Sequence, residues 1–318
     1  MNTDFKPAWW LPSPHLQTLW PFFFRKRPQL NLRHEQLDLA DGDFLDLCWS
    51  QRTAGQWVLL MHGLEGSIKS SYAAGLFAVL ESQGYRPVFM HFRGCSGRHN
   101  RLDRAYHSGD TADIATVVEH ITRQTGTPVF AVIGSSLGGN VLLKWLGETG
   151  AANPLSKAVA ISVPFRLGDA ANRLNQGGSR LYRNYLLGKL RRKIIDKFAG
   201  KKSPIKVDVR SLKSFWDYDK HVTAVLHGFN GADDYYTQSS SRQYLQSIRI
   251  PTQIIHALDD PFMFKESVPE PAELSDSIDF ELALHGGHVG FVSGTLPWRP
   301  HYWHEQKICE FLKRPEVP

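Results

Sequence analysis

The sequence predicts an α/β fold in which a largely parallel sheet is covered by helices on both faces. Short apolar runs such as residues 57–61 and 252–257 have the composition of strands buried on both sides. Helix-like stretches separate such runs in regular alternation, which is typical of parallel strands joined by right-handed crossovers. The 318 residues suffice for one large domain with an insertion, and we expect a single domain over 1–318.

The elements follow one another in a readable order. Residues 36–39 and 44–47 alternate apolar and polar side chains around a polar turn and predict a β-hairpin. Apolar periodicity then predicts helices and buried strands along the rest of the chain. The expected strands are 57–61, 87–90, 129–133, 158–163, 252–257 and 278–284, and the expected helices are 72–83, 110–122, 141–147 and 303–312.

Two segments do not fit the alternation. The first, residues 1–33, is aromatic and rich in proline, so it must pack either on its own domain or on a membrane interface or substrate cleft. The second, about residues 164–250, reads as a mainly helical lid insertion over the carboxyl edge of the sheet. Its basic run between Arg180 and Lys202 is compatible with binding nucleic acid or an anionic membrane, but apolar residues interleave at helical spacing and favour a solvated amphipathic face.

The stretch from Val129 to Asn140 predicts a strand, a very tight turn and a helix, with Ser136 at the apex of the turn. Gly134 and Gly138 lie two residues before and after Ser136, and they remove Cβ atoms where strand and helix pass closely. Such a turn lifts the hydroxyl out of the fold, where it acts as a nucleophile if a base reaches it. The alternative interpretation is an ordinary helix-capping serine.

A nucleophilic serine needs a carboxylate to orient its base, and two candidates follow the strand at 252–257. In open α/β sheets, reacting groups collect beyond the carboxyl ends of the strands. In the usual pattern the acid comes three residues after a small residue that closes the strand, and counting from Ala257 gives Asp260. We therefore favour Asp260 over Asp259, which we expect to be a surface or turn-stabilising carboxylate.

The base is expected after the last strand, at His285 or His288. Gly286 and Gly287 let the loop fold back toward Ser136, and His288 follows them, so we favour His288. The resulting chain order of serine, acid and histidine is the one expected of α/β-hydrolases. Carbonyl attack also creates an oxyanion that backbone N–H groups must stabilise. We expect these donors to be Leu137, directly after the nucleophile, and Leu64, in the glycine-containing loop 62–66.

The composition indicates the redox compartment of the protein and which cofactors and partners to expect. Three widely separated cysteines favour reduced thiols in a cytoplasmic protein. The histidines show no metal-ligand spacing, so no metal and no organic cofactor are expected. The net charge of +6 is a modest excess, and no nucleic acid partner is expected.

Several motifs together resemble the YheT-type branch of the α/β-hydrolases, over nearly the whole chain. They are Pro14-His15-Leu16-Gln17-Thr18, His62-Gly63-Leu64-Glu65-Gly66, Arg93-Gly94-Cys95-Ser96-Gly97, Gly134-Ser135-Ser136-Leu137-Gly138-Gly139, Asp259-Asp260-Pro261 and Gly286-Gly287-His288-Val289-Gly290-Phe291. The resemblance implies a carboxylesterase with Ser136 as nucleophile, Asp260 as acid and His288 as base.

The resulting hypothesis is a serine esterase that acts on small to medium acyl esters through an acyl-enzyme intermediate. A monoacylglycerol-lipase-like enzyme or an alcohol O-acyltransferase would use the same residues. Hydrolysis and acyl transfer share the acyl-enzyme and differ only in whether water or an alcohol attacks it. The non-enzymatic alternative is a protein that binds anionic surfaces through its basic segment and N-terminal aromatic side chains, and peripheral membrane contact is compatible with either reading.

Overall fold

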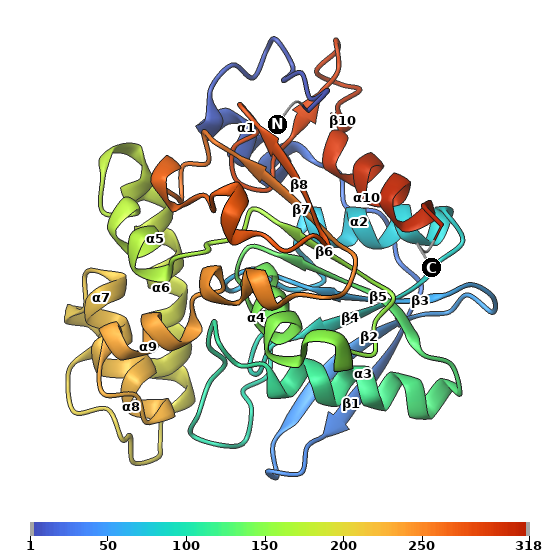
Figure 1. The fold of residues 1–318 in the computed structure, drawn as a ribbon. Helices are drawn as coiled ribbons and strands as arrows, with labels where there is room; N and C mark the ends of the chain where they lie inside the picture. The colour runs from blue at the N-terminus through green and yellow to red at the C-terminus, as the bar shows by residue number, and fades with distance from the viewer. Residues whose placement is uncertain (1–2, 316–318) are drawn as a thin grey trace.

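An eight-stranded sheet forms the centre of the computed structural model, which describes residues 3–315 (Figure 1). The first two strands form an antiparallel hairpin at one edge, the second strand is antiparallel to β4, and the other neighbours are parallel. The predicted largely parallel sheet is thus confirmed. Across the sheet the strands are β1 (Leu32–Asp38), β2 (Phe44–Ser50), β4 (Arg86–His91), β3 (Trp57–Met61), β5 (Val129–Ser135), β6 (Lys157–Ile161), β7 (Thr252–Ala257) and β8 (Ile278–Ala283).

Helices cover both faces of this sheet. One face packs against α3 (Ala112–Thr125) and α4 (Leu137–Thr149), and the other against α2 (Ser71–Ser82) and α10 (Trp303–Lys313). Side chains alternate along each strand, so that every strand contributes to both cores. This two-sided burial explains why the strand runs are continuously apolar.

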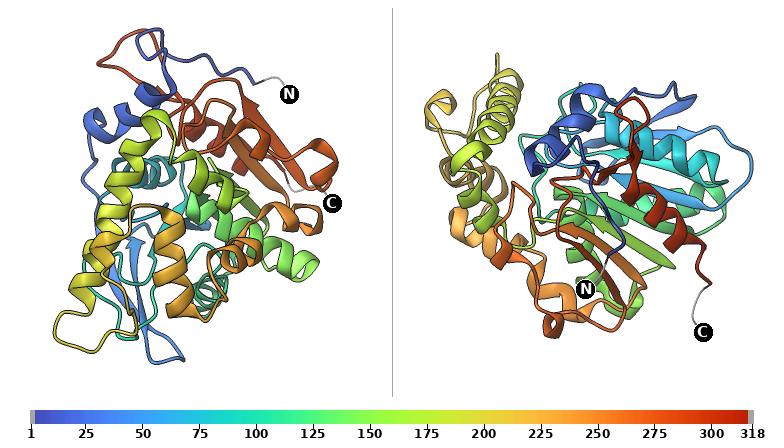
Figure 2. Two further views of the ribbon diagram at one scale, coloured as in Figure 1. Left: turned by 90° about the vertical axis from the view of Figure 1, so that its left-hand side faces the viewer. Right: turned by 90° about the horizontal axis from the view of Figure 1, so that it is seen from above.

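Residues 164–250 form a helical layer beside the sheet (Figure 2). The helices from α5 to α9 share a hydrophobic cluster of their own, whereas Leu245 of the last turn packs in the core on one face of the sheet. The division of the chain into a single domain with a lid insertion remains a prediction, and its outermost residues 1–2 and 316–318 lie outside the described residues. The elements of the insertion are α5 (Leu167–Arg173), η2 (Gly177–Ser179), α6 (Arg180–Lys197), η3 (Val209–Ser211), α7 (Phe215–Tyr218), η4 (Asp219–Thr223), α8 (Ala224–His227), α9 (Ala232–Ser239) and η5 (Arg242–Ser247).

The N-terminal aromatic segment contains a helix, α1 (Pro14–Phe24), which the sequence analysis did not assign. Ser13 caps it by accepting a hydrogen bond from the backbone N–H of His15, and proline stands at the first helical position. The rings of Trp10 and Trp20 pack at 4.6 Å and join a small cluster on the molecule's own surface. Part of the segment therefore packs on its own domain, as one of the two interpretations predicts.

Basic residues on α6 are not all solvated, which corrects one expectation. Lys193 and Lys197 point into the protein: the Lys193 ammonium lies 2.5 Å from Glu65 Oε1, and that of Lys197 lies 2.5 Å from Asn100 Oδ1. The apolar periodicity correctly predicted an amphipathic helix, but the long lysine stems also let these cations reach buried acceptors. Part of the positive charge on α6 therefore attaches the insertion to the loops after β3 and β4.

Element boundaries shift from the predicted ones where the backbone turns sharply. The helix expected at 141–147 begins at Leu137, directly after the turn, and the strand expected to reach residue 163 ends at Ile161. Ser162 has a φ of 50°, which takes the chain out of the sheet.

Short elements complete the fold. They are η1 (Gly150–Ala152), η6 (Lys265–Ser267), η7 (Pro271–Glu273) and a hairpin of β9 (Val292–Ser293) and β10 (His301–Tyr302). Among residues 3–315, no helix combines the length and hydropathy needed to cross a membrane.

Candidate active site

Ser136 lies at the junction of β5 and α4, in a backbone conformation that serine rarely adopts. Its φ is 53° and its ψ is −119°. A Cβ on Gly134 would lie 2.4 Å from the Gly138 carbonyl oxygen, and one on Gly138 would lie 2.6 Å from the His62 carbonyl oxygen. Both glycines are therefore required by close backbone packing, as the sequence motif predicted. The strain costs roughly 1–3 kcal/mol, and such strain is concentrated at functional sites.

His288 connects Ser136 to a buried carboxylate. Its Nε2 lies 3.0 Å from Ser136 Oγ, and its Nδ1 lies 2.8 Å from Asp260 Oδ2. The Asp260 side chain is only 1% exposed, and its other oxygen accepts the backbone N–H of Phe262 at 2.8 Å. The Phe262 ring stacks on the imidazole with centroids 3.9 Å apart. Three segments that are far apart in the sequence thus meet in one hydrogen-bonded chain.

The alternative candidates form a second acid–histidine pair that does not contact Ser136. Asp259 Oδ1 accepts the Gly287 backbone N–H at 2.9 Å, and Asp259 Oδ2 lies 3.2 Å from His285 Nδ1. The His285 side chain is largely exposed. Burial raises the pKa of Asp259, and the Gly287 bond acts in the opposite direction. Asp259 therefore stabilises the turn that carries His288, the role expected for it.

Helix α1 holds the loop of His288 in place, and the sequence reasoning missed this contact. Thr18 Oγ1 accepts the backbone N–H of His288 at 2.9 Å. The buried side chain of Gln17 binds both the N–H and the carbonyl of Val292, at 2.7 and 3.0 Å. A Cβ on Gly287 would lie 2.5 Å from the Pro14 carbonyl oxygen. The glycines before His288 thus do more than turn the chain, because they make room for α1.

Two backbone amides near Ser136 have free N–H groups. Leu137 opens α4, and Leu64 lies in the loop after β3, where a Cβ on Gly63 would lie 3.0 Å from Ser136 Cβ. The neighbouring amides of Gly63 and Glu65 donate to the hydroxyls of Tyr72 and Tyr106, each at 2.9 Å. Within the described part of the chain, the N–H groups of Leu64 and Leu137 donate no hydrogen bond. Both are therefore available to a ligand at Ser136.

His62 supports this loop and does not act as a base. Its Nδ1 donates to the Gly63 carbonyl at 2.6 Å, and its Nε2 accepts the backbone N–H of Phe92 at 3.1 Å. Burial lowers the pKa of His62 to about 3, so the ring stays neutral. Over the described range 3–315, no group of three or more His, Cys, Asp or Glu side chains is arranged to hold a metal ion.

Arg93, from the motif after β4, ties the loops around the site together. Its guanidinium binds Asp113 of α3 at 2.6 and 2.8 Å, Asp41 at 2.7 Å and Asp43 at 3.0 Å. The arginine and two of its three partners are almost fully buried. Removing one member of such a buried cluster leaves uncompensated charge, so Arg93 has a structural role.

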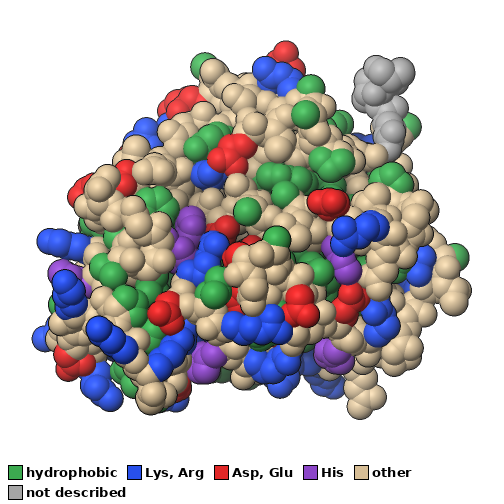
Figure 3. All heavy atoms as spheres, turned by 90° about the horizontal axis from the view of Figure 1, so that it is seen from below, with side chains coloured by type: hydrophobic (Ala, Val, Ile, Leu, Met, Phe, Trp, Pro, Cys, Tyr) green, Lys and Arg blue, Asp and Glu red, His purple; other side chains and the backbone are tan. Residues whose placement is uncertain are grey.

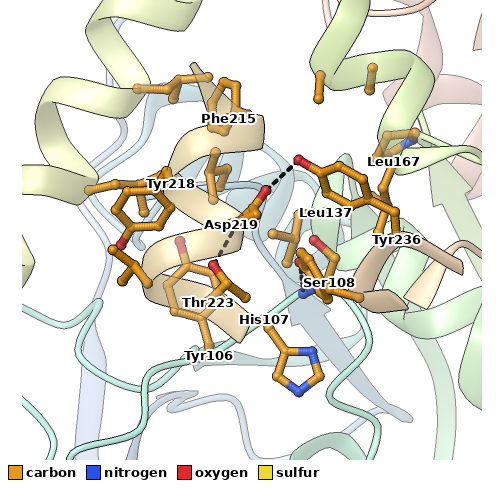
Figure 4. Close-up of a pocket in the computed structure, with 18 of the residues that line it drawn as sticks. Tyr106, His107, Ser108, Leu137, Leu167, Phe215, Tyr218, Asp219, Thr223 and Tyr236 are labelled. Carbon is orange, nitrogen blue, oxygen red and sulfur yellow. Dashed lines mark hydrogen bonds between the residues drawn. The ribbon is translucent and has the colours of Figure 1, made fainter. Parts of the chain in front are cut away.

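A cavity of about 130 Å³ lies between Ser136 and the helical insertion. Figure 4 shows part of its wall, with Leu137 on one side and Leu167 and Phe215 of the insertion among the other lining residues. Ser136, His288, Leu64 and Leu137 line one side of it. Apolar side chains of α5, α6 and α7 line part of the remainder, including Leu167, Leu186, Leu190, Ile194 and Phe215. None of the described residues before residue 34 lines this cavity, and contact of the N-terminal segment with a substrate stays a prediction.

Comparison with known proteins places these features in a family. A family model described as alpha/beta hydrolase fold matches residues 56–295. The Escherichia coli (strain K12) protein named "Putative esterase YheT" is 39% identical over 318 residues, covering 98% of this chain and 93% of that protein. "Phospholipase ABHD3" of Homo sapiens is 30% identical and covers 95% of this chain and 77% of that protein. The Pyrococcus furiosus esterase Pf2001 shares the fold, with a TM-score of 0.61 at 16% identity, over 90% of this chain and 91% of that one.

Proposed function

The chain is a YheT-like member of the α/β-hydrolase family, and from this premise we propose that it is a serine carboxylesterase for esters with small to medium acyl groups. The observation that carries the proposal is the hydrogen-bonded chain from Ser136 through His288 to Asp260 at the wall of an apolar cavity. The names of two relatives, an esterase and a phospholipase, both describe cleavage of ester bonds and support this reaction class.

Acylation begins when Ser136 Oγ attacks the carbonyl carbon of the ester while His288 Nε2 takes the hydroxyl proton. The carbonyl oxygen becomes an oxyanion, which the N–H groups of Leu64 and Leu137 stabilise. Asp260 holds the imidazole in the required tautomer and stabilises the imidazolium. The tetrahedral intermediate then collapses, and His288 gives its proton to the departing alcohol, which leaves an acyl group on Ser136.

Deacylation repeats these steps with water. His288 takes a proton from a water molecule, whose oxygen attacks the acyl carbon, and the same two amides bind the second oxyanion. Collapse of this intermediate returns the proton to Ser136 Oγ and releases the carboxylic acid. All groups that this cycle needs belong to the chain or to water.

The size of the cavity supports the proposed acyl range. An apolar cavity of about 150 Å³ holds one benzene molecule, and the volume of about 130 Å³ here is of the same order, as small apolar groups require. The apolar lining favours a hydrocarbon chain, because each buried methylene contributes about 0.8 kcal/mol to binding.

The test is reaction of the purified protein with p-nitrophenyl butyrate and with a fluorophosphonate probe. We expect steady release of nitrophenol, inhibition by the probe, and covalent mass on the peptide that contains Ser136. The probe reacts only with a serine whose proton is removed by a base, so it reports the activated hydroxyl directly. Absence of both turnover and labelling, in protein with a cooperative melting transition, would contradict the proposal.

A surface patch favours a second function, docking on an anionic lipid surface. Phe22, Phe23 and Phe24 of α1 and Leu181 and Tyr185 of α6 are each between 50% and 73% exposed. The rings of Phe22 and Phe23 are 4.9 Å apart, and those of Phe22 and Tyr185 are 5.9 Å apart, so the two helices present one surface. Exposed aromatic side chains of this kind are typical of membrane-interface contacts.

Cations beside this α1–α6 patch select a partner of negative charge. Lys26 and Arg27 follow α1, and Lys189 and Arg192 continue the exposed face of α6. None of these four forms an ion pair with any residue that the structure describes, and Lys189 Nζ donates one hydrogen bond, to the Glu65 carbonyl at 2.9 Å. By contrast, the face seen from below intersperses Lys and Arg with Asp and Glu (Figure 3). Apolar rings beside unpaired cations match an anionic bilayer, which offers both phosphate groups and acyl chains.

Vesicle sedimentation tests this docking. We expect the protein to sediment with equimolar phosphatidylcholine–phosphatidylglycerol vesicles and only weakly with phosphatidylcholine alone. Changing Phe22, Phe23 and Phe24 to serine should weaken vesicle binding by more than about tenfold, because three rings no longer enter the interface. Val225→Ser, which alters an exposed apolar residue on α8, is the matched control. Three outcomes would contradict membrane docking. They are equal vesicle binding by the triple variant, binding to DNA but not to vesicles, and a dimer whose interface covers the patch.

A further inference from the structure

The wall of the cavity carries one acidic side chain that the catalytic cycle does not use. Asp219 opens a π-helical turn, Asp219–Thr223, between α7 and α8. Its Oδ1 accepts a hydrogen bond from the Thr223 hydroxyl, and its Oδ2 accepts one from the Tyr236 hydroxyl, both at 2.6 Å. Figure 4 shows the carboxyl group between these two side chains, within the group of residues that line the cavity. Single π-helical turns inside helices occur frequently at functional sites.

This carboxyl group retains capacity for further hydrogen bonds. An ionised carboxylate accepts about four, and only two are filled here. No ion pair with Asp219 is formed by residues 3–315. Burial raises the pKa of Asp219 to about 6, against the opposing effect of its two hydroxyl donors. At neutral pH it is therefore mostly an anionic acceptor without a cationic partner, in a setting where such groups are costly.

A second polar group on the same wall has no partner at all. Tyr218 is 5% exposed and lines the cavity, and its hydroxyl makes no hydrogen bond to any described residue. The Tyr218 oxygen keeps some accessible surface, so its hydroxyl is open to a ligand. The strong acceptor and the free hydroxyl come from adjacent residues at the start of the π-helical turn.

We propose that Asp219 and Tyr218 form a polar subsite that binds hydroxyl groups of the substrate, so that the preferred substrates are hydroxyl-bearing esters. The proposal rests on the proposed esterase function, since it takes the cavity as the substrate site. A hydroxyl donates to the carboxylate and accepts from a phenol, and it is cheaper to desolvate than a charged group. Lys193 also lines the cavity, and its ammonium is paired with Glu65.

Binding to the Ser136→Ala protein tests the subsite without any turnover. The probes are matched esters with and without hydroxyl groups: propyl butyrate against 2,3-dihydroxypropyl butyrate, and ethyl hexanoate against ethyl 6-hydroxyhexanoate. The first pair places the hydroxyl groups on the alcohol and the second on the acyl chain, so the two arms identify which part reaches Asp219. Calorimetry should give a Kd about tenfold or more lower for the hydroxylated member of at least one pair.

Variants separate recognition from a purely structural role. In the Ser136→Ala background, Asp219→Asn should reduce the Kd ratio of the preferred pair by about tenfold, and Tyr218→Phe should reduce it several-fold. Thr223→Val removes one hydrogen bond to Asp219 but leaves the carboxylate, so the ratio should persist. Ratios near one in both arms overturn the proposal, as do ratios that neither variant changes. Because Kd is measured without hydrolysis, these outcomes are independent of whether the wild-type protein cleaves esters.

Discussion

Replacing Ser136 by alanine is expected to lower kcat for p-nitrophenyl butyrate by roughly 10⁴- to 10⁶-fold. The variant lacks the atom that forms the acyl-enzyme, whereas the oxyanion donors and the cavity remain. Alanine has nearly the backbone freedom of serine at a φ of 53°, so the melting temperature should change little. The measurement is steady-state release of nitrophenol, together with loss of fluorophosphonate labelling.

The adjacent Ser135→Ala variant is the matched control for this experiment. Ser135 is the last residue of β5, is 3% exposed, and its side chain makes no hydrogen bond to the described residues. The Ser135→Ala variant loses a hydroxyl group one position from the nucleophile, and its kcat should stay within a few-fold of the wild-type value. Equal activity in Ser136→Ala and the wild type would refute the proposed nucleophile.

Changing Asp260 to asparagine should lower kcat by about 10⁴-fold. The amide oxygen would continue to accept the Phe262 N–H, as Asp260 Oδ1 does at 2.8 Å. The amide NH₂ would then face His288 Nδ1 and donate to it, which places the ring proton on Nε2. In that tautomer the imidazole has no lone pair for the Ser136 proton, so the base is lost although the fold is retained.

Asp259→Asn decides between the two neighbouring acids. Its amide oxygen can still accept the Gly287 N–H, so the turn before His288 should persist and kcat should stay within a few-fold. The pair of variants is compared by kcat and by melting temperature in the same buffer. A large loss in Asp259→Asn with a mild effect in Asp260→Asn would reverse the assignment of the acid.

Local sequence chemistry was enough to locate the turn at Ser136. The requirement for glycine at Gly134 is visible in the sequence because a Cβ there would meet the backbone of Gly138, four residues away, whereas Gly138 is required by the distant His62 carbonyl. The strands were equally readable, because burial on both faces leaves a continuous apolar run. The acid and histidine could be narrowed to two candidates each, since strand ends are where such groups collect.

Tertiary structure decided between candidates and supplied the contacts that no local pattern encodes. His288 and Asp260 are 28 residues apart, and Thr18 and His288 are 270 apart, so only the folded chain shows which groups meet. Asp219 lies in the insertion that the sequence predicts only as mainly helical, and its place on the cavity wall depends on how the insertion packs.

The sequence by itself thus determined the sheet, the strained turn and the set of candidate reacting residues. Those features follow from side-chain period and backbone sterics, which act over a few residues. Only the tertiary structure determined which histidine contacts Ser136 and which acid contacts that histidine, that α1 braces the His288 loop, and that a carboxyl group lines the cavity. Those facts depend on packing between distant segments, which is set by the shape of the whole core.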